Sequence, residues 1–335
     1  MVYHFNMTNK EQIFKDKYDK REFKFSYSSM NRLRFSPKLF YKDYILKDRE
    51  VRIEKHLIEG RLLHLLLLQP ENFDQEFILT PSKLPSDTLR KVIMNIMLYT
   101  DAEELSTVED KIILDSLKEV GLYQSLKDES KRVAKVRTTE CEDFYIFSQT
   151  KGKDVIDQTM YDKTVERVEV VKSKADIINL LDPIITDFEL DETETFAEAY
   201  LECDLKDHKF GLKGYVDKYI IDHKKRAITI IDIKTSGKSI VNFAETVEYY
   251  NYWMQAAVYT MLVLKNVPDG IQGYKINFNF IVVDTYNQVY NFGVREETMQ
   301  TWGKELMKIL KACKYHLDEM NFDLPYEFIN NKVML

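Results

Sequence analysis

Apolar residues recur three and four positions apart from Tyr27 to Leu68, a spacing typical of helices with one buried face. Pro37 stands where a second helix can begin, since proline is favoured in a first helical turn. A third helix is expected over Val51–Leu68. It should end before Pro70, because the residue preceding a proline disfavours the helical conformation. Residues 1–25 are polar and rich in charge, which predicts a mobile lead-in.

The middle of the chain is also helical in pattern but shows no catalytic signature. Helical spacing recurs at residues 89–98, 111–117 and 155–181. We interpret a segment at about 74–195 as a helical insertion or lid within a single domain that covers residues 26–335.

Apolar and polar residues alternate from about residue 196 to residue 236, with glycine breaks, and this predicts three strands. A long helix is expected over residues 243–265, then two strands within 272–294 and an amphipathic helix over 296–319. This order predicts an α/β (α+β) core, in which helices flank a short central mixed sheet.

One strand of this predicted core carries charged residues on an apolar face. Because side chains alternate along a strand, Asp232 and Lys234 project on the same side as Ile228 and Ile230. Burying such charges without partners costs on the order of several kcal/mol, and a metal ion is one natural partner. An exposed acid–base pair on an edge strand is the alternative, since D-x-K by itself is common.

The preceding strand supplies a second acid. If residues 223–226 form a four-residue hairpin loop, Asp222 pairs with Ala227 and Asp217 falls opposite Asp232. Directly opposed side chains have Cβ atoms roughly 5 Å apart, close enough for two carboxylates to hold one divalent cation. A slip of one residue would point Asp217 the other way and leave it as a solvated acid near the turn.

Two carboxylates and an ammonium group suit the hydrolysis of a phosphodiester. Carboxylate oxygens are preferred ligands of Mg²⁺, and Mn²⁺ is the other candidate ion. The ion makes bound water more acidic and polarises the phosphate. Lys234 orients or activates the nucleophile and balances charge.

The same residues resemble a known family. Asp217, followed by Asp232-Ile233-Lys234, is similar to the paired acids and lysine of PD-(D/E)XK nucleases. Gln255 and Tyr259 resemble the Q-x-x-x-Y motif of RecB-like nucleases, and the tyrosine-rich lead-in before them resembles exonuclease VIII (RecE). The resemblance implies a restriction-endonuclease-like core. Its implied catalytic residues are Asp217, Asp232, Lys234, Gln255 and Tyr259, and its metal ligands include Asp217, Asp232 and the backbone carbonyl of Ile233.

Upstream segments extend the resemblance. Gly60 to His64 resembles the G-x-x-x-H helix of the same group, whose histidine lies beside the metal, so the resemblance implies His64 as a ligand. The alternative is a hydrogen-bonded core histidine. Ser28 and Ser29 resemble the opening segment of the group. The matches cover residues 26–73 and 196–262, approximately.

Four residues are candidates for DNA contact. Ser28, Ser29 and Arg61 suit a phosphate, and Tyr252 suits a base. The serines serve equally well as helix caps, and Tyr252 with its neighbours Tyr249 and Tyr250 can instead be core residues.

Charge and cysteine content narrow the function. The net charge is −7 although 48 Lys and Arg are present, so a DNA-binding surface must be concentrated in a groove or channel. Three cysteines, Cys141, Cys203 and Cys313, cannot supply the four ligands of an iron–sulfur cluster, and we expect none. No signal peptide or membrane-spanning stretch is recognisable, which predicts a cytoplasmic location, in a bacterial host cell if the chain is of phage type.

The resemblance to the exonuclease VIII group implies a phage-type exonuclease that digests linear duplex DNA in the 5′-to-3′ direction, in recombination or repair. It further implies a homo-oligomeric ring around the DNA and a single-strand annealing protein as partner. A RecB-like endonuclease or single-strand nuclease is the alternative within the family. A catalytically silent DNA-binding scaffold is the other, against which the complete set of two acids and a lysine argues.

Overall fold

A computed structural model describes residues 8–49, 54–183 and 192–330, and the chain divides into two compact units. Unit 1 comprises Met1–Glu54 and Arg167–Leu335, and unit 2 comprises Lys55–Glu166. The interpretation of residues 74–195 as an insertion within one domain stays a prediction.

Unit 1 contains a six-stranded mixed sheet. Its strands are β1 (Lys24–Phe25), β4 (Thr193–Asp204), β5 (Gly211–Asp222), β6 (Ala227–Ser236), β7 (Lys275–Asp284) and β8 (Val289–Val294). The strand order is β1-β5-β6-β7-β8, with β4 also paired to β5. The β6–β7 pair is parallel and therefore needs a crossover connection, whereas β4–β5, β5–β6 and β7–β8 are antiparallel.

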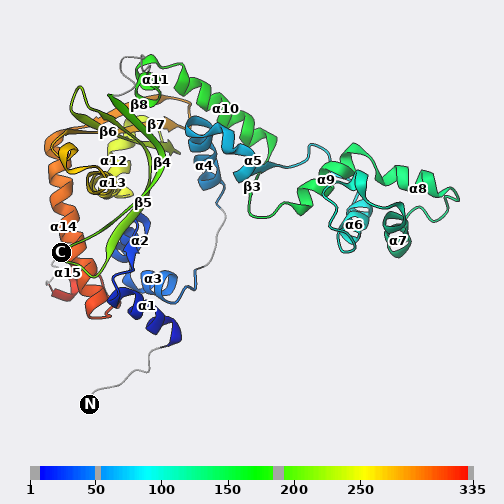
Figure 1. The fold of residues 1–335 in the computed structure, drawn as a ribbon, viewed down its shortest axis with the longest axis horizontal. Helices are drawn as coiled ribbons and strands as arrows, with labels where there is room; N and C mark the ends of the chain where they lie inside the picture. The colour runs from blue at the N-terminus through cyan, green and yellow to red at the C-terminus, as the bar shows by residue number, and fades with distance from the viewer. Residues whose placement is uncertain (1–7, 50–53, 184–191, 331–335) are drawn as a thin grey trace. The chain divides into compact units, whose positions relative to one another are not determined.

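Helices surround this sheet, and two of them form the β6–β7 crossover (Figure 1). The helices of unit 1 are α1 (Asn9–Asp19), α2 (Tyr27–Phe35), α3 (Pro37–Phe40) with a π-helical turn (Tyr41–Ile45), α11 (Ala175–Leu181), α12 (Phe243–Tyr249), α13 (Tyr252–Asn266), α14 (Glu296–Asp318) and α15 (Tyr326–Asn330). Short 3-10 turns lie at Ile240–Asn242 and Asp269–Ile271, and α10 (Gln158–Lys172) crosses the boundary between the two units.

The core of unit 1 forms where α13 packs on one face of the sheet (Figure 1). Ile228 and Ile230 of β6 and Phe278 and Phe280 of β7 are buried in this core together with Met254 and the residues after it on α13. The predicted α/β core, a short mixed sheet flanked by helices, is therefore confirmed.

Two segments differ from the sequence prediction. Within the lead-in expected to be mobile, residues 9–19 form α1, which has a Thr8–Glu11 capping box and buries Phe14 and Tyr18. The single helix expected over residues 243–265 is two helices, because Asn251 between them adopts a left-handed conformation with φ 58°. Such a residue ends one helix and redirects the chain into the next.

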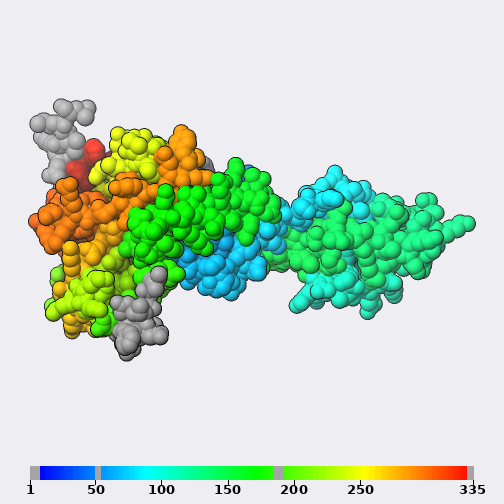
Figure 2. Space-filling view, turned by 90° about the horizontal axis from the view of Figure 1, so that it is seen from above, coloured from blue at the N-terminus to red at the C-terminus, as the bar shows by residue number. Residues whose placement is uncertain are grey.

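Unit 2 is mainly helical and has two hydrophobic clusters of its own. Helices α6 to α9 enclose one cluster as a closely packed body (Figure 2), and α4, β2 and β3 contribute to the other. The elements are α4 (Lys55–Leu68), α5 (Phe73–Glu76), β2 (Phe77–Leu79), α6 (Asp87–Ile96), α7 (Asp110–Val120), α8 (Glu129–Val136), α9 (Thr139–Gln149) and β3 (Asp154–Ile156), with 3-10 turns at Pro70–Asn72 and Leu105–Thr107. The helix expected over Val51–Leu68 ends as predicted before Pro70, whereas residues 50–53 lie outside the described part of the chain.

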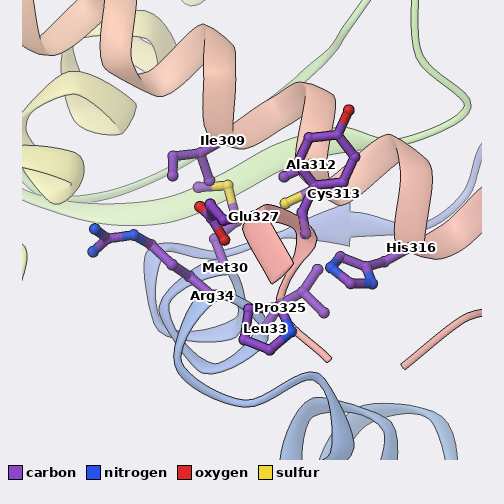
Figure 3. Close-up of a pocket in the computed structure, with 10 residues that line it drawn as sticks. Met30, Leu33, Arg34, Ile309, Ala312, Cys313, His316, Pro325 and Glu327 are labelled. Carbon is purple, nitrogen blue, oxygen red and sulfur yellow. The ribbon is translucent and has the colours of Figure 1, made fainter. Parts of the chain in front are cut away.

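A small cavity lies among α2, α14 and α15, and its lining includes Met30, Cys313 and His316 (Figure 3). Its volume is about 20 Å³, which is room for a single water molecule. The His316 ring is buried, and its Nδ1 atom lies 2.5 Å from the carbonyl oxygen of Asn321. We interpret this cavity as a packing gap. Among the described residues, no helix is both long enough and apolar enough to cross a membrane.

Candidate active site

The β5–β6 hairpin has the predicted register. Five consecutive pairs run from Asp222↔Ala227 to Lys218↔Ile231, and the four residues between the strands form the loop. The next step of the same register sets Asp217 opposite Asp232. The regular ladder of backbone hydrogen bonds between β5 and β6 ends there. Beyond it, Oδ2 of Asp217 accepts a hydrogen bond of 2.7 Å from the backbone N–H of Ile233. This hydrogen bond fixes the Asp217 side chain beside β6.

A third carboxylate joins these two from β4. Ala197 pairs with Lys218 and Ala199 with Val216, so the β4–β5 register sets Glu198 opposite Asp217. Glu198 has a φ of 46°, a conformation that costs a non-glycine residue about 1–3 kcal/mol and that clusters at functional sites. One carboxylate oxygen of Glu198 lies within 4.8 Å of one of Asp217. We call Glu198, Asp217 and Asp232 the acid row.

Lys234 supplies positive charge to this acid row. Its Nζ atom lies 2.6 Å from Oδ2 of Asp232, whose side chain is completely buried. Burial lowers the pKa of the Lys234 ammonium group, but the Asp232 and Asp217 carboxylates outweigh that effect and hold this pKa above its usual value. The alternative of an exposed pair on an edge strand is wrong, because β6 lies between β5 and β7.

Helix α13 brings two further predicted residues to the acid row. The side-chain amide of Gln255 donates a hydrogen bond of 2.8 Å to the Tyr259 hydroxyl, and both side chains are buried. Burial, and then the negative charge of Asp217 and Asp232, raises the pKa of Tyr259 well above its usual value. Gly214 on β5 favours the close approach of α13, since an added Cβ atom would lie 3.2 Å from the Tyr259 ring.

The remaining predicted residues are distributed over both units. His64 is half-buried on α4 of unit 2, and its role as a ligand stays a prediction. On the same helix, the Arg61 guanidinium donates to Asp154 at 2.5 Å and lies 3.5 Å from Glu76, so its charge is already balanced within unit 2.

The two serines of α2 differ in exposure. Ser26 is the N-cap, and Ser29 is the buried third residue of its capping box, with an Oγ that donates to the Ser26 carbonyl oxygen at 2.9 Å. Ser28 is exposed and is therefore the more available of the two for a DNA phosphate. Tyr252, the other candidate for DNA contact, is half-buried, and its ring centroid lies 4.8 Å from Nζ of Lys234.

The acid row suits a hard divalent cation. Its donors are carboxylate oxygens, the ligand type that Mg²⁺ and Mn²⁺ prefer. A divalent cation would bring positive charge to a site that holds three carboxylates and one lysine.

Cavity size is a poorer guide to the site than charge and register. A hollow of about 450 Å³ lies among α13, the start of β7 and α14, with Tyr274, Glu296 and Gln300 in its lining. The acid row is built on β4, β5 and β6 instead.

Sequence reasoning missed Glu198. The strand that carries it was predicted, but its contribution depends on the β4–β5 register and on its positive φ. Strand alternation gave no signal for it, because the core-facing residues change from Phe196 to Ala199 and Leu201 across the positive φ of Glu198.

The fold and the acid row together are those of an α/β protein equipped to hold a divalent cation. The profile of the PD-(D/E)XK nuclease superfamily matches residues 24–323, and the chain therefore belongs to that superfamily. This membership supports nuclease activity with DNA as the substrate.

Comparison with solved structures gives remote similarities. A crystal structure of a proposed exonuclease from Eubacterium rectale is 11% identical, with a TM-score of 0.43, and the alignment covers 99% of this chain and 95% of that one. The structure of SSO0001 is also 11% identical, with a TM-score of 0.23 and coverage of 79% of this chain and 96% of that one. A comparison with curated proteins found no match.

Proposed function

We propose that this chain is a divalent-metal-dependent DNA exonuclease that acts on linear duplex DNA. The observation that carries the proposal is the acid row, with Lys234 bound to its fully buried member Asp232. Superfamily membership supports the reaction class, and the acid row supports the metal.

Each residue has a defined part in the proposal. The cation would be held by Asp217, Asp232, Glu198 and the carbonyl of Ile233, and the family resemblance adds His64 as a proposed ligand. When bound, the cation makes water more acidic and offsets charge on the phosphate. Lys234 directs its ammonium group to the phosphate or to the attacking water. Gln255 orients the Tyr259 hydroxyl beside the acids through their hydrogen bond.

End-labelled linear duplex, closed circular duplex and single-stranded DNA test the proposal, each incubated with Mg²⁺, with Mn²⁺ and with EDTA. We expect only the linear duplex to be degraded, and only with a metal. Nicking of the circle would favour the endonuclease alternative. DNA binding without any cleavage would favour the silent scaffold.

A matched pair of variants separates site chemistry from general damage. Asp217→Asn removes an acid-row charge. Asp222→Asn changes an acid on the same strand that instead contacts Lys225 in the hairpin loop. Cleavage should fall at least about 100-fold for the first variant, as when electrostatic stabilisation is removed at an active site, and stay near wild type for the second.

Finer parts of the proposal rest on the resemblance to the exonuclease VIII group. They are 5′-to-3′ polarity, a phage-type role in recombination beside a single-strand annealing protein, a cytoplasmic location, and a ring whose channel concentrates basic residues despite the net charge of −7. Separate 5′ and 3′ labels on the duplex test the polarity, and light scattering of the purified protein tests the ring.

A further inference from the structure

Three tyrosine rings lead from Lys234 to solvent at the break between α12 and α13. Tyr252 lies under the Lys234 ammonium group and is half-buried, Tyr250 is 47% exposed, and Tyr249 is 75% exposed. The Tyr250 and Tyr252 rings are stacked, with centroids 5.5 Å apart and planes at 25°. Tyr249 meets Tyr250 edge-on, with centroids 4.9 Å apart. Exposure thus increases with distance from the site.

Core packing explains only the innermost ring. Tyr252 lies 6.4 Å, between ring centroids, from both Phe243 and Phe280 of the core. Tyr249 and Tyr250 are instead exposed, so packing in the core does not account for their aromatic rings.

The backbone that carries these rings is held in place by α2. The Tyr27 hydroxyl donates to the carbonyl oxygen of Tyr250. The Asn251 side chain donates to Asn31 at 2.8 Å and accepts from the guanidinium of Arg34. A fixed aromatic surface loses little conformational freedom when a ligand stacks on it.

Positive charge accompanies the rings. Nζ of Lys234 lies 4.8 Å from the Tyr252 centroid, and Nζ of Lys238 lies 5.7 Å from the Tyr249 centroid. Aromatic faces beside cations are the combination that binds single-stranded nucleic acid, because bases stack on the rings and phosphates meet the cations. The cation at one end of this series, Lys234, belongs to the candidate active site.

We propose that Tyr249 and Tyr250 form a stacking subsite for unpaired bases of the DNA strand whose phosphate lies at the acid row. This inference rests on the proposed function and adds a substrate feature to it. DNA with an unpaired end should bind better than blunt duplex, since blunt DNA must first lose base pairing at its terminus.

A fluorescent base tests the subsite without cleavage. 2-Aminopurine is placed in a short single-stranded overhang of a duplex, and binding is followed in Ca²⁺ by quenching of its emission. Tyr249→Leu should remove most of the quenching and weaken overhang binding about tenfold, while Tyr249→Trp should retain both effects. Because Tyr249 is largely exposed, the leucine variant should fold normally.

Tyr286→Leu is the matched control, since Tyr286 is 71% exposed in the turn between β7 and β8 and lies outside the tyrosine series. Equal quenching and affinity for Tyr249→Leu and Tyr286→Leu would overturn the inference, even if the wild type cleaves DNA. Quenching that depends on Tyr249 in a protein without nuclease activity would support the subsite and overturn only the proposed function.

Discussion

Replacing Lys234 with methionine should destabilise unit 1 in the absence of divalent cations. Methionine keeps much of the side-chain length but leaves the fully buried Asp232 carboxylate without the ammonium group that lies 2.6 Å away. Removing one member of a buried ion pair costs about 3–5 kcal/mol, because a charge then stays in a poorly solvating environment. Asp217 and Glu198 add negative charge to the same place, so the loss should fall within that range rather than below it.

Tryptophan fluorescence measures this loss in the relevant part of the chain. Both tryptophans, Trp253 on α13 and Trp302 on α14, belong to unit 1, so their emission reports the unfolding of that unit. With a urea dependence of about 2–3 kcal/mol/M, the midpoint in EDTA should fall by roughly 1–2.5 M. Saturating Mg²⁺ should restore part of the loss, since a cation then meets the same carboxylates.

A second variant distinguishes charge from packing. Removing both charges, in Asp232→Asn/Lys234→Met, should recover most of the stability that Lys234→Met loses, because no unbalanced charge then remains in the pair. A Lys234→Met midpoint equal to that of the wild type in EDTA would refute the reasoning, since Asp232 would then not need the ammonium group.

Three other predictions follow from the site and the core. Asp217→Asn should abolish the heat change of Mg²⁺ binding in isothermal titration calorimetry, and a wild-type titration curve for the variant would contradict the assignment. Gly214→Ala should cost about 1–3 kcal/mol in urea unfolding and reduce cleavage, because the added methyl group lies 3.2 Å from the Tyr259 ring; unchanged stability would show that α13 moves freely. Burial lowers the pKa of His316, so the unfolded chain binds more protons and unfolding free energy should decrease as pH falls below about 6.5. His316→Gln should flatten that dependence, and an identical pH profile would contradict it.

The β5–β6 hairpin could be predicted because its determinants are local. The loop at residues 223–226 fixes the β5–β6 register, and the register alone sets Asp217 opposite Asp232. The Thr8–Glu11 capping box was also legible in the sequence, and with it α1 could have been predicted. These features depend only on spacing along a short stretch of chain.

The remaining features depend on backbone conformation that residue patterns do not specify. Apolar spacing continues from α12 into α13, so the left-handed Asn251 between them interrupts no pattern, although asparagine is among the residues that tolerate this conformation. Glu198 likewise joins the site through a positive φ on β4. Neither position can be told apart by residue type from an ordinary polar residue.

At position 198, the residue that best suits the backbone differs from the residue that the acid row needs. Glycine would adopt its φ of 46° without penalty, so a substitution that relieves the backbone would also delete a carboxylate from the acid row. In the described residues β4 pairs only with β5, which makes it an outer strand that can absorb such a change. A screen for heat resistance alone would therefore select against the acid row of the proposed metal site, and engineering for stability should keep residue 198 fixed.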